Sequence, residues 1–185
     1  VIAANDPVPA SDRRGDDMAG IFYTGGTTGF PKGVMQSHRA IWASAIGAMP
    51  DFHMKRDSVY LHVAPMFHMA DFAGGMGLTL CCGTNVILQS FDPGLVLGTI
   101  GAEKISHVLM VPAMIKMVLH HPDAGTADMS TLSTIMYGAS PMPAATLEEC
   151  MSTWPGVSLV QAYGQTELAP VATTLSAADH LDGGQ

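Results

Sequence analysis

The sequence predicts an α/β fold built on a mostly parallel sheet with helices on both faces. Short apolar runs rich in β-branched residues alternate with segments of helical length, and turn or capping residues separate them. This alternation is typical of βαβ units, because parallel strands need a crossover connection that packs on a face of the sheet. The 185 residues, 48% of them hydrophobic, are enough to bury one good core. Residues 1–17, without periodicity, are expected to be an irregular lead-in to a domain covering 18–185.

Capping residues support the individual elements. Strands are expected at residues 20–23, 34–36, 58–63, 84–89, 106–110, 134–137 and 157–161, and helices at 38–48, 66–82, 93–103, 112–120 and 143–154. Ser37 is a good N-cap for the first helix, and Asp92 for the third, with Pro93 at the first helical position. We expect Pro112 and Pro143 to occupy that first position in the next two helices.

The segment from Tyr23 to Gly33, Y-T-G-G-T-T-G-F-P-K-G, is the most informative about function. Glycine lets the backbone turn its amide groups toward a ligand, and the nearby hydroxyls and lysine add donors and a positive charge. Such a group of donors suits phosphate better than a plain hairpin turn. The residues expected to contact phosphate are Thr24, Gly25, Gly26, Thr27, Thr28, Gly29 and Lys32.

The loop differs from a Walker P-loop. That motif follows its lysine with Ser or Thr and runs from a strand directly into a helix. Here Pro31 precedes Lys32 and Gly33 follows it, so the magnesium-binding hydroxyl is missing. Pro31 also disfavours helix at the residue before it. We therefore expect a strand, the loop and a second short strand, with the helix capped only at Ser37.

Two further segments complete a recognisable set. Residues 137–141 read Y-G-A-S-P and residues 163–167 read Y-G-Q-T-E, and both fall at the carboxyl ends of expected strands, where α/β sheets bind ligands. With the loop ending in P-K-G, they resemble, in order, the signatures of the AMP-forming acyl-CoA synthetases of the adenylate-forming superfamily. The loop reads T-G-G where many members have T-S-G, which removes one hydroxyl and keeps the backbone donors.

The resemblance implies that the chain is a partial N-terminal domain of an adenylate-forming enzyme. The family's ribose-binding aspartate, hinge and C-terminal lid with its catalytic lysine would all follow Gln185. We therefore expect this chain alone to be inactive or nearly so in CoA ligation.

The resemblance also implies roles for the last signature. Glu167 would hold Mg²⁺ while the metal grips phosphate oxygens, and Thr166 would hydrogen-bond the α-phosphate. Together with Lys32, these residues would carry the chemistry of the first step. Taken alone, the pair would be an ordinary threonine and glutamate at a helix start.

The adenine and acyl sites follow from the same resemblance. Small residues let a flat base approach the backbone, and Tyr163 would stack on it, although packing in the core is an alternative. His68 would line the acyl pocket, although a lone histidine in an apolar helix is often a core residue. The residues expected around adenine are Gly138, Ala139, Ser140, Gln161, Tyr163 and Gly164.

The implied reaction joins a carboxylic acid to CoA with ATP, giving acyl-CoA, AMP and pyrophosphate through acyl-AMP. A fatty or other apolar acid is expected, because some of the 14 methionines can shape a flexible hydrophobic tunnel. Two alternatives stay open. The acyl group could pass to a carrier-protein thiol or to oxidation, as in luciferase, or the chain could be a nucleotide-binding module without catalysis.

Charge and cysteine content narrow the remaining classes. The net charge of −8 disfavours nucleic acid and anionic membrane surfaces as partners. The most apolar stretch, 67–82, contains Asp71 and three glycines, so it is expected to be a core helix and not a membrane span. The three cysteines lack a C-x-x-C pair, and we expect buried or partly buried thiols in the reducing cytoplasm. The histidines at 62, 107, 120 and 121 lack zinc-ligand spacing.

Overall fold

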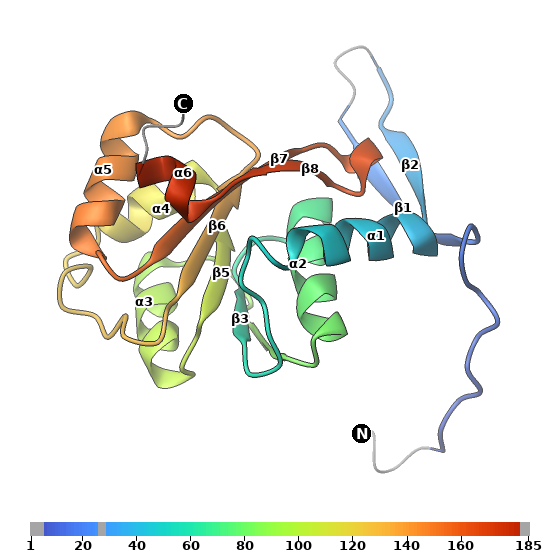
Figure 1. Ribbon diagram of the computed structural model, residues 1–185, viewed down its shortest axis with the longest axis horizontal. Helices are drawn as coiled ribbons and strands as arrows, with labels where there is room; N and C mark the ends of the chain where they lie inside the picture. Colours follow the sequence, from blue (N-terminus) through green and yellow to red (C-terminus); the bar gives the residue numbers. More distant parts are fainter. Residues whose placement is uncertain (1–5, 26–28, 182–185) are drawn as a thin grey trace.

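The computed structural model describes residues 6–25 and 29–181, and it joins a hairpin to a larger sheet through one helix (Figure 1). In the hairpin, β1 (Met18–Thr24) and β2 (Lys32–Ser37) pair antiparallel and stand apart from the main sheet. α1 (His38–Ala48) follows directly, and the hydroxyl of its N-cap Ser37 accepts a hydrogen bond from the Ala40 amide at 3.1 Å. The predicted succession of strand, loop, strand and capped helix is confirmed.

The main sheet confirms the predicted α/β class. Its strands lie in the order β4-β3-β5-β6-β7-β8, and every neighbouring pair is parallel except β7 and β8. The strands are β3 (Val59–His62), β4 (Thr84–Ile87), β5 (His107–Met110), β6 (Thr134–Gly138), β7 (Ser158–Gly164) and β8 (Val171–Leu175). The helices that follow α1 are α2 (Met69–Leu80), α3 (Pro93–Ala102), α4 (Pro112–Leu119), α5 (Ala144–Thr153) and α6 (Ala177–Leu181), with a short 3-10 turn η2 (Thr166–Leu168).

Alternating side chains along the strands build one core on each face of the sheet. On β6, Ile135 packs into the core beneath α3, α4 and α5, whereas Met136 packs toward α1 and α2. On β3, Leu61 and Tyr60 divide between the faces in the same way, and all four side chains are fully buried. Figure 1 shows α3, α4 and α5 on one side of the sheet and α1 and α2 on the other, as predicted.

Helix starts agree with the caps at most positions. The Asp92 carboxylate accepts a hydrogen bond from the Leu95 amide at 2.9 Å, and Pro93 and Pro112 begin their helices as predicted. Pro143 is a correction, because it is the N-cap of α5, which begins at Ala144. α2 begins at Met69 instead of residue 66, because a turn closed by the His68 amide on the Pro65 carbonyl (2.9 Å) precedes it.

The end of the chain departs most from expectation. β7 extends to Gly164, so Tyr163 and Gly164 are its last residues instead of the residues after it. The chain then passes through η2, turns at Ala169 with a φ of 66°, and returns as β8. Neither β8 nor α6 was expected from the sequence.

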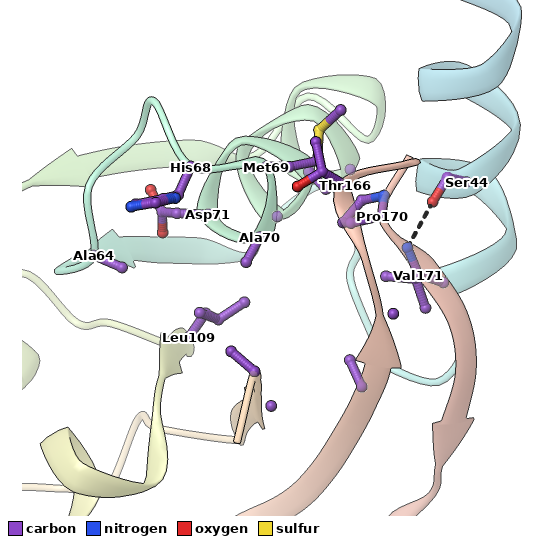
Figure 2. Close-up of a pocket in the computed structure, with 18 of the residues that line it drawn as sticks. Ser44, Ala64, His68, Met69, Ala70, Asp71, Leu109, Thr166, Pro170 and Val171 are labelled. Atoms are coloured by element: carbon purple, nitrogen blue, oxygen red, sulfur yellow. Dashed lines mark hydrogen bonds between the residues drawn. The ribbon is translucent and has the colours of Figure 1, made fainter. Parts of the chain in front are cut away.

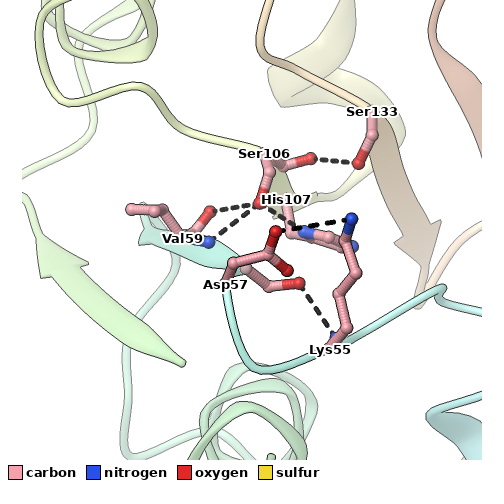
Figure 3. A network of polar contacts seen from close by, with 7 residues as sticks. Lys55, Asp57, Val59, Ser106, His107 and Ser133 are labelled. Carbon is pink, nitrogen blue, oxygen red and sulfur yellow. Dashed lines mark hydrogen bonds and ion pairs between the residues drawn. The ribbon is translucent and has the colours of Figure 1, made fainter. Parts of the chain in front are cut away.

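Polar side chains join the amino ends of the central strands (Figure 3). Ser106 Oγ accepts a hydrogen bond from the Val59 amide at 2.8 Å, and Ser133 Oγ donates to the Ser106 carbonyl at 2.8 Å. His107 Nε2 donates to the Phe52 carbonyl at 2.9 Å, and burial lowers the pKa of this imidazole despite that bond. These contacts hold the starts of β3, β5 and β6 together at the amino ends of the strands. The cavity described below lies at their carboxyl ends.

The apolar stretch and the thiols behave mostly as expected. Within residues 6–25 and 29–181, no helix has both the length and the apolar character needed to cross a membrane, and α2 packs in the core. All three cysteines are free thiols, and burial raises the pKa of Cys150 to about 12. Cys82 is exposed, which corrects the expectation that every thiol is at least partly buried.

Candidate functional site

A cavity of about 490 Å³ lies between α1, α2 and the carboxyl ends of the central strands. Figure 2 shows His68 and Asp71 on one side of it and Thr166 and Pro170 on another. The cavity therefore lies where parallel sheets commonly bind ligands. The Val171 amide donates to Ser44 Oγ at 3.3 Å, which ties β8 to α1 across one wall.

One end of the cavity is formed by the two signatures at the strand ends. Gly138, Ala139, Tyr163, Gly164 and Thr166 all line it. A Cβ at Gly138 would lie 2.3 Å from the Ala162 carbonyl oxygen, and a Cβ at Gly164 would lie 1.9 Å from that of Pro170. These two glycines therefore let β6, β7 and the returning chain approach one another closely.

Tyr163 shows which of its two predicted environments holds. Its side chain is 66% exposed at the end of β7 and lines the cavity, so the core alternative is wrong. Ser140 and Gln161 do not line the cavity. Ser140 is exposed on the turn after β6, and Gln161 is half-buried within β7.

Much of the remaining wall of the cavity is apolar. Ala45 and Ala48 from α1, Met69 from α2, Leu109 from β5 and Met114 from α4 contribute to its walls. His68 is not inside the helix, as the sequence suggested, but is the N-cap of α2, where it is exposed and lines the cavity. A histidine at the rim of an apolar cavity fits the predicted acyl pocket better than a core position.

The hairpin carries the described part of the glycine–threonine loop. Thr24 Oγ1 donates to the Lys32 carbonyl at 3.4 Å, which joins the two ends of the loop. Gly25, Gly29 and Lys32 are exposed, and none of them lines the cavity. Three of the predicted phosphate contacts, Gly26, Thr27 and Thr28, lie outside the described residues.

A buried side chain ties the hairpin to the second strand-end signature. Gln36 Nε2 donates to the Thr166 carbonyl at 2.6 Å, and Gln36 is only 4% exposed. Figure 1 shows the η2 turn beside β2. The strand that follows the loop and the turn that carries Glu167 are therefore in contact, and nothing in the sequence indicated that Gln36 would connect them.

Glu167 stands as an exposed carboxylate in η2, next to the cavity-lining Thr166. No group of three or more His, Cys, Asp or Glu side chains with metal-binding geometry occurs in the described part of the chain. Mg²⁺ commonly uses one or two carboxylates together with substrate phosphates and water. A single accessible carboxylate beside the nucleotide signatures fits Mg²⁺ brought in with phosphate, and it does not fit a cage made by protein alone.

A network of buried polar side chains beneath α2 was not expected from the sequence. Asp71, fully buried and part of the cavity wall, accepts a hydrogen bond from the Tyr60 hydroxyl at 3.0 Å. Its other oxygen lies 2.6 Å from Nδ1 of His62, whose Nε2 lies 2.7 Å from Oδ1 of Asn85. An aspartate in an apolar helix was the available signal, because a buried carboxylate requires partners.

Two pKa values follow from this chain of contacts. Burial by itself lowers the pKa of His62, but hydrogen bonds to Asp71 and Asn85 and the charge of Asp71 outweigh it and raise the pKa above its ordinary value. Burial and the same carboxylate raise the pKa of Tyr60 well above its ordinary value, so the phenol stays protonated.

Comparison with known proteins decides the family. A model of the family described as "AMP-binding enzyme" matches residues 2–184. The chain belongs to this family. Its relatives in the AMP-binding family include a feruloyl-CoA synthase of an Amycolatopsis species, 36% identical over 95% of this chain and 36% of that protein. The medium/long-chain-fatty-acid–CoA ligase FadD8 of Mycobacterium tuberculosis is 34% identical over 94% of this chain and 30% of that protein.

Solved structures of AMP-binding enzymes share the fold. The N-terminal domain of FACL13 from Mycobacterium tuberculosis superposes with a TM-score of 0.87 at 28% identity, covering 95% of this chain and 44% of that one. The o-succinylbenzoate CoA synthetase MenE of Bacillus subtilis, in complex with ATP and magnesium ion, has a TM-score of 0.82 at 27% identity over 92% and 35%. The chain spans about a third of the length of these curated relatives.

Proposed function

We propose that the protein containing this chain uses ATP to convert an apolar carboxylic acid into acyl-AMP, and then transfers the acyl group to CoA. One observation carries the proposal. A single cavity joins the nucleotide signatures at Gly138 and Thr166 to an apolar chamber whose rim bears His68. A nucleotide at one end and an acid at the other would place the α-phosphorus beside the carboxylate.

The loop would bind the phosphates of ATP. Backbone amides around Gly25 and Gly29, with the hydroxyls of the loop threonines, would donate to phosphate oxygens. Lys32 is exposed at the first residue of β2, so its ammonium group is accessible to a phosphate. The full set proposed for this role is Thr24, Gly25, Gly26, Thr27, Thr28, Gly29 and Lys32.

Glu167 and Thr166 would act at the α-phosphate. The Thr166 hydroxyl would donate to an α-phosphate oxygen, and the Glu167 carboxylate would hold Mg²⁺. The metal would supply neutralisation of charge on the phosphates. The fixed Gln36–Thr166 contact supports this arrangement, because it holds the η2 turn against the hairpin.

The adenine would lie over the ends of β6 and β7. The exposed Tyr163 ring offers a face for stacking, and Gly138 and Gly164 line the same part of the cavity without side chains. Ala139 lines the same end, and Ser140 and Gln161 would supply polar contacts from positions just outside the cavity.

The chemistry proceeds by two displacements. A carboxylate oxygen attacks the α-phosphorus, and the bond to the bridging oxygen breaks so that pyrophosphate leaves. The CoA sulfur, having lost its proton, then attacks the acyl carbonyl carbon, and AMP leaves. Neither step requires a covalent intermediate on this chain, so its residues bind, orient and neutralise charge.

The identity of the acceptor has one competitor with a specific observation behind it. The amide bond synthetase McbA from Marinactinospora thermotolerans shares the fold, with a TM-score of 0.77 at 26% identity over 87% of this chain and 32% of that one. An amine could therefore replace CoA in the second step. Supplying acyl-AMP with CoA, with amines and with a carrier protein in separate reactions distinguishes these acceptors.

Acid-dependent exchange between ATP and pyrophosphate tests the first step. We expect the full-length protein to catalyse exchange with apolar acids, fatty or aromatic, and much less with small polar acids. ATP binding without exchange for any acid would contradict the proposed reaction and favour a nucleotide-binding module. A polypeptide limited to residues 1–185 is expected to form little or no acyl-CoA. The proposed compartment is the cytoplasm, with which the three free thiols agree.

A further inference from the structure

A buried polar chain connects α2 to the sheet beneath it. It runs from the Tyr60 hydroxyl to Asp71, from Asp71 to His62, and from His62 to Asn85 on the neighbouring strand. Tyr60, His62 and Asp71 are each at most 1% exposed. Of these four hydrogen-bonded side chains, Asp71 is the one that comes from α2, and it also forms part of the cavity wall.

The two rings of this chain also contact each other directly. The ring centroids of Tyr60 and His62 lie 4.6 Å apart in an edge-to-face arrangement. The titratable groups that face His62 are thus Asp71 from α2 and Tyr60 from its own strand, while β4 contributes the neutral amide of Asn85.

Both ring nitrogens of His62 lie within hydrogen-bond distance of oxygen atoms, and a doubly protonated ring satisfies both by donating to each. The raised pKa of His62 agrees with this imidazolium form. The Asp71 carboxylate accepts from this ring and from the Tyr60 hydroxyl, so the buried pair is neutral overall and each polar group has a partner. Removing one charge from such a pair leaves the other buried without compensation.

Glycines on α2 leave space for the same polar side chains. A Cβ at Gly74 would lie 2.5 Å from the Tyr60 hydroxyl oxygen, and a Cβ at Gly75 would lie 2.9 Å from Cε1 of His62. A larger residue at either position would force the helix or these side chains to shift. The short distance between helix and sheet therefore depends on both the glycines and the ion pair.

The same helix supplies much of the apolar wall. Met69, Ala70, Ala73, Gly74 and Gly77 all line the cavity. A small displacement of α2 would change the width of the cavity, and acids are discriminated in such cavities by how well their volume is matched.

We propose that the His62–Asp71 ion pair is a positioning device that holds α2 at a fixed height over β3 and so determines which acids the cavity accepts. This rests on the proposed function only in assigning the acid to this cavity. His62 and Asp71 act through the helix and do not contact the reacting atoms.

Equilibrium binding of acids to the full-length protein tests the proposal without requiring catalysis. Calorimetric Kd values would be measured for straight-chain fatty acids of increasing length and for hydroxycinnamic acids. For Asp71→Asn we expect the ratio of Kd values between the best and the next larger acid to fall by about tenfold, with the Kd for ATP unchanged. Asp57→Asn makes the same chemical change at an exposed carboxylate and is expected to leave the ratio unchanged.

A compensating pair separates positioning from general weakening. In the double variant His62→Gln and Asp71→Asn, an amide can donate to an amide oxygen across the same gap, so no charge is left unpaired. We expect this variant to recover the acid ratio to within about threefold of the unaltered protein. A role limited to stability would lower the melting temperature and weaken all acids alike, and that result in a folded Asp71→Asn protein overturns the proposal.

Two measurements keep the proposal testable if Asp71→Asn does not fold. A nuclear magnetic resonance titration of the unaltered protein should show His62 losing its proton at a higher pH than an ordinary histidine. A His62 that titrates at or below the ordinary value overturns the proposal. Gly74→Ala leaves both charges in place but crowds the Tyr60 hydroxyl beneath α2, and we expect it to change the acid ratio in the same direction as Asp71→Asn.

The outcomes also separate this proposal from the proposed reaction. If the unaltered protein binds no apolar acid, the cavity assignment and the positioning role both fail. If it binds acids selectively and never adenylates them, only the proposed reaction fails.

Discussion

The described part of the hairpin loop is exposed to solvent, whereas the cavity under α2 is formed largely by buried and partly buried side chains. Around the loop, Tyr23 is 71% exposed and Phe30 is 93% exposed, whereas at the cavity Met69 is 4% exposed and Asp71 is fully buried. The loop offers backbone donors and one cation to whatever approaches from solvent. The cavity offers a shape that depends on how α1, α2 and the strands pack. Substitutions in the loop should therefore affect nucleotide chemistry alone, and substitutions in the cavity should affect the choice of acid.

The largest effect is expected from Lys32→Ala. Losing a cation aimed at developing phosphate charge should lower the rate of ATP–pyrophosphate exchange by about a hundredfold to a thousandfold. Binding of the acid should be unchanged, because Lys32 does not line the cavity. The matched control is Lys55→Ala, another exposed lysine, paired with Asp57 and far from the loop in sequence. Equal losses in both variants would contradict the role of the loop.

Glu167→Gln tests the proposed magnesium-binding carboxylate. The amide keeps the size of the side chain but loses its charge, so we expect exchange to fall by about a hundredfold and to recover partly at high magnesium. Glu148→Gln, at an exposed position of α5, is the control. A rate with an unchanged magnesium dependence would remove Glu167 from the site.

Gly164→Ala tests the close backbone packing where β7 ends and the chain turns toward β8. Its Cβ would lie 1.9 Å from the Pro170 carbonyl oxygen, so the turn into β8 must shift. We expect a loss of about 2 kcal/mol in the free energy of unfolding, measured by denaturant titration. At Gly98 in α3, a Cβ meets no atom within 4 Å, and Gly98→Ala should instead stabilise the protein by about 0.5–1 kcal/mol.

Ala73→Leu sharpens the contrast from the side of the cavity. The larger side chain would fill part of the chamber, so the Kd for bulky acids should rise by about tenfold while the Kd for ATP stays constant. Ala43→Leu, on the exposed surface of α1, should change neither constant. A parallel rise for ATP and acid would show that the two ends of the cavity are not separable.

The smallest effect concerns the pH dependence of stability. The pKa of His62 is raised in the folded protein above the ordinary 6.5, so its stabilising contribution is complete below 6.5 and is lost as pH rises through the folded pKa. The difference in unfolding free energy between the unaltered protein and His62→Gln should therefore decline with rising pH. The slope can reach at most about 1.4 kcal/mol per pH unit for one proton. A difference that grows with pH would contradict the ion pair.

Local signals predicted the parts that act locally. Ser37 and Asp92 mark helix starts because a cap needs only the neighbouring amides, and Pro112 marks one because its fixed φ suits the first helical position. The fold class followed from the alternation of strands and helices. By contrast, β8 was missed because its pairing with β7 is antiparallel and depends on the turn at Ala169.

The sequence by itself determined the fold class, the family and two chemically distinctive segments, the glycine–threonine loop and the Thr166–Glu167 turn. It could do so because short motifs specify backbone donors and charges without knowledge of the packing. Only the tertiary structure decided that Gln36 joins the hairpin to that turn, that Tyr163 is exposed, and that Asp71 is paired with His62. The physical reason is that burial and long-range hydrogen bonds bring together residues far apart in sequence. Residue type alone does not say which partner a buried polar group will find.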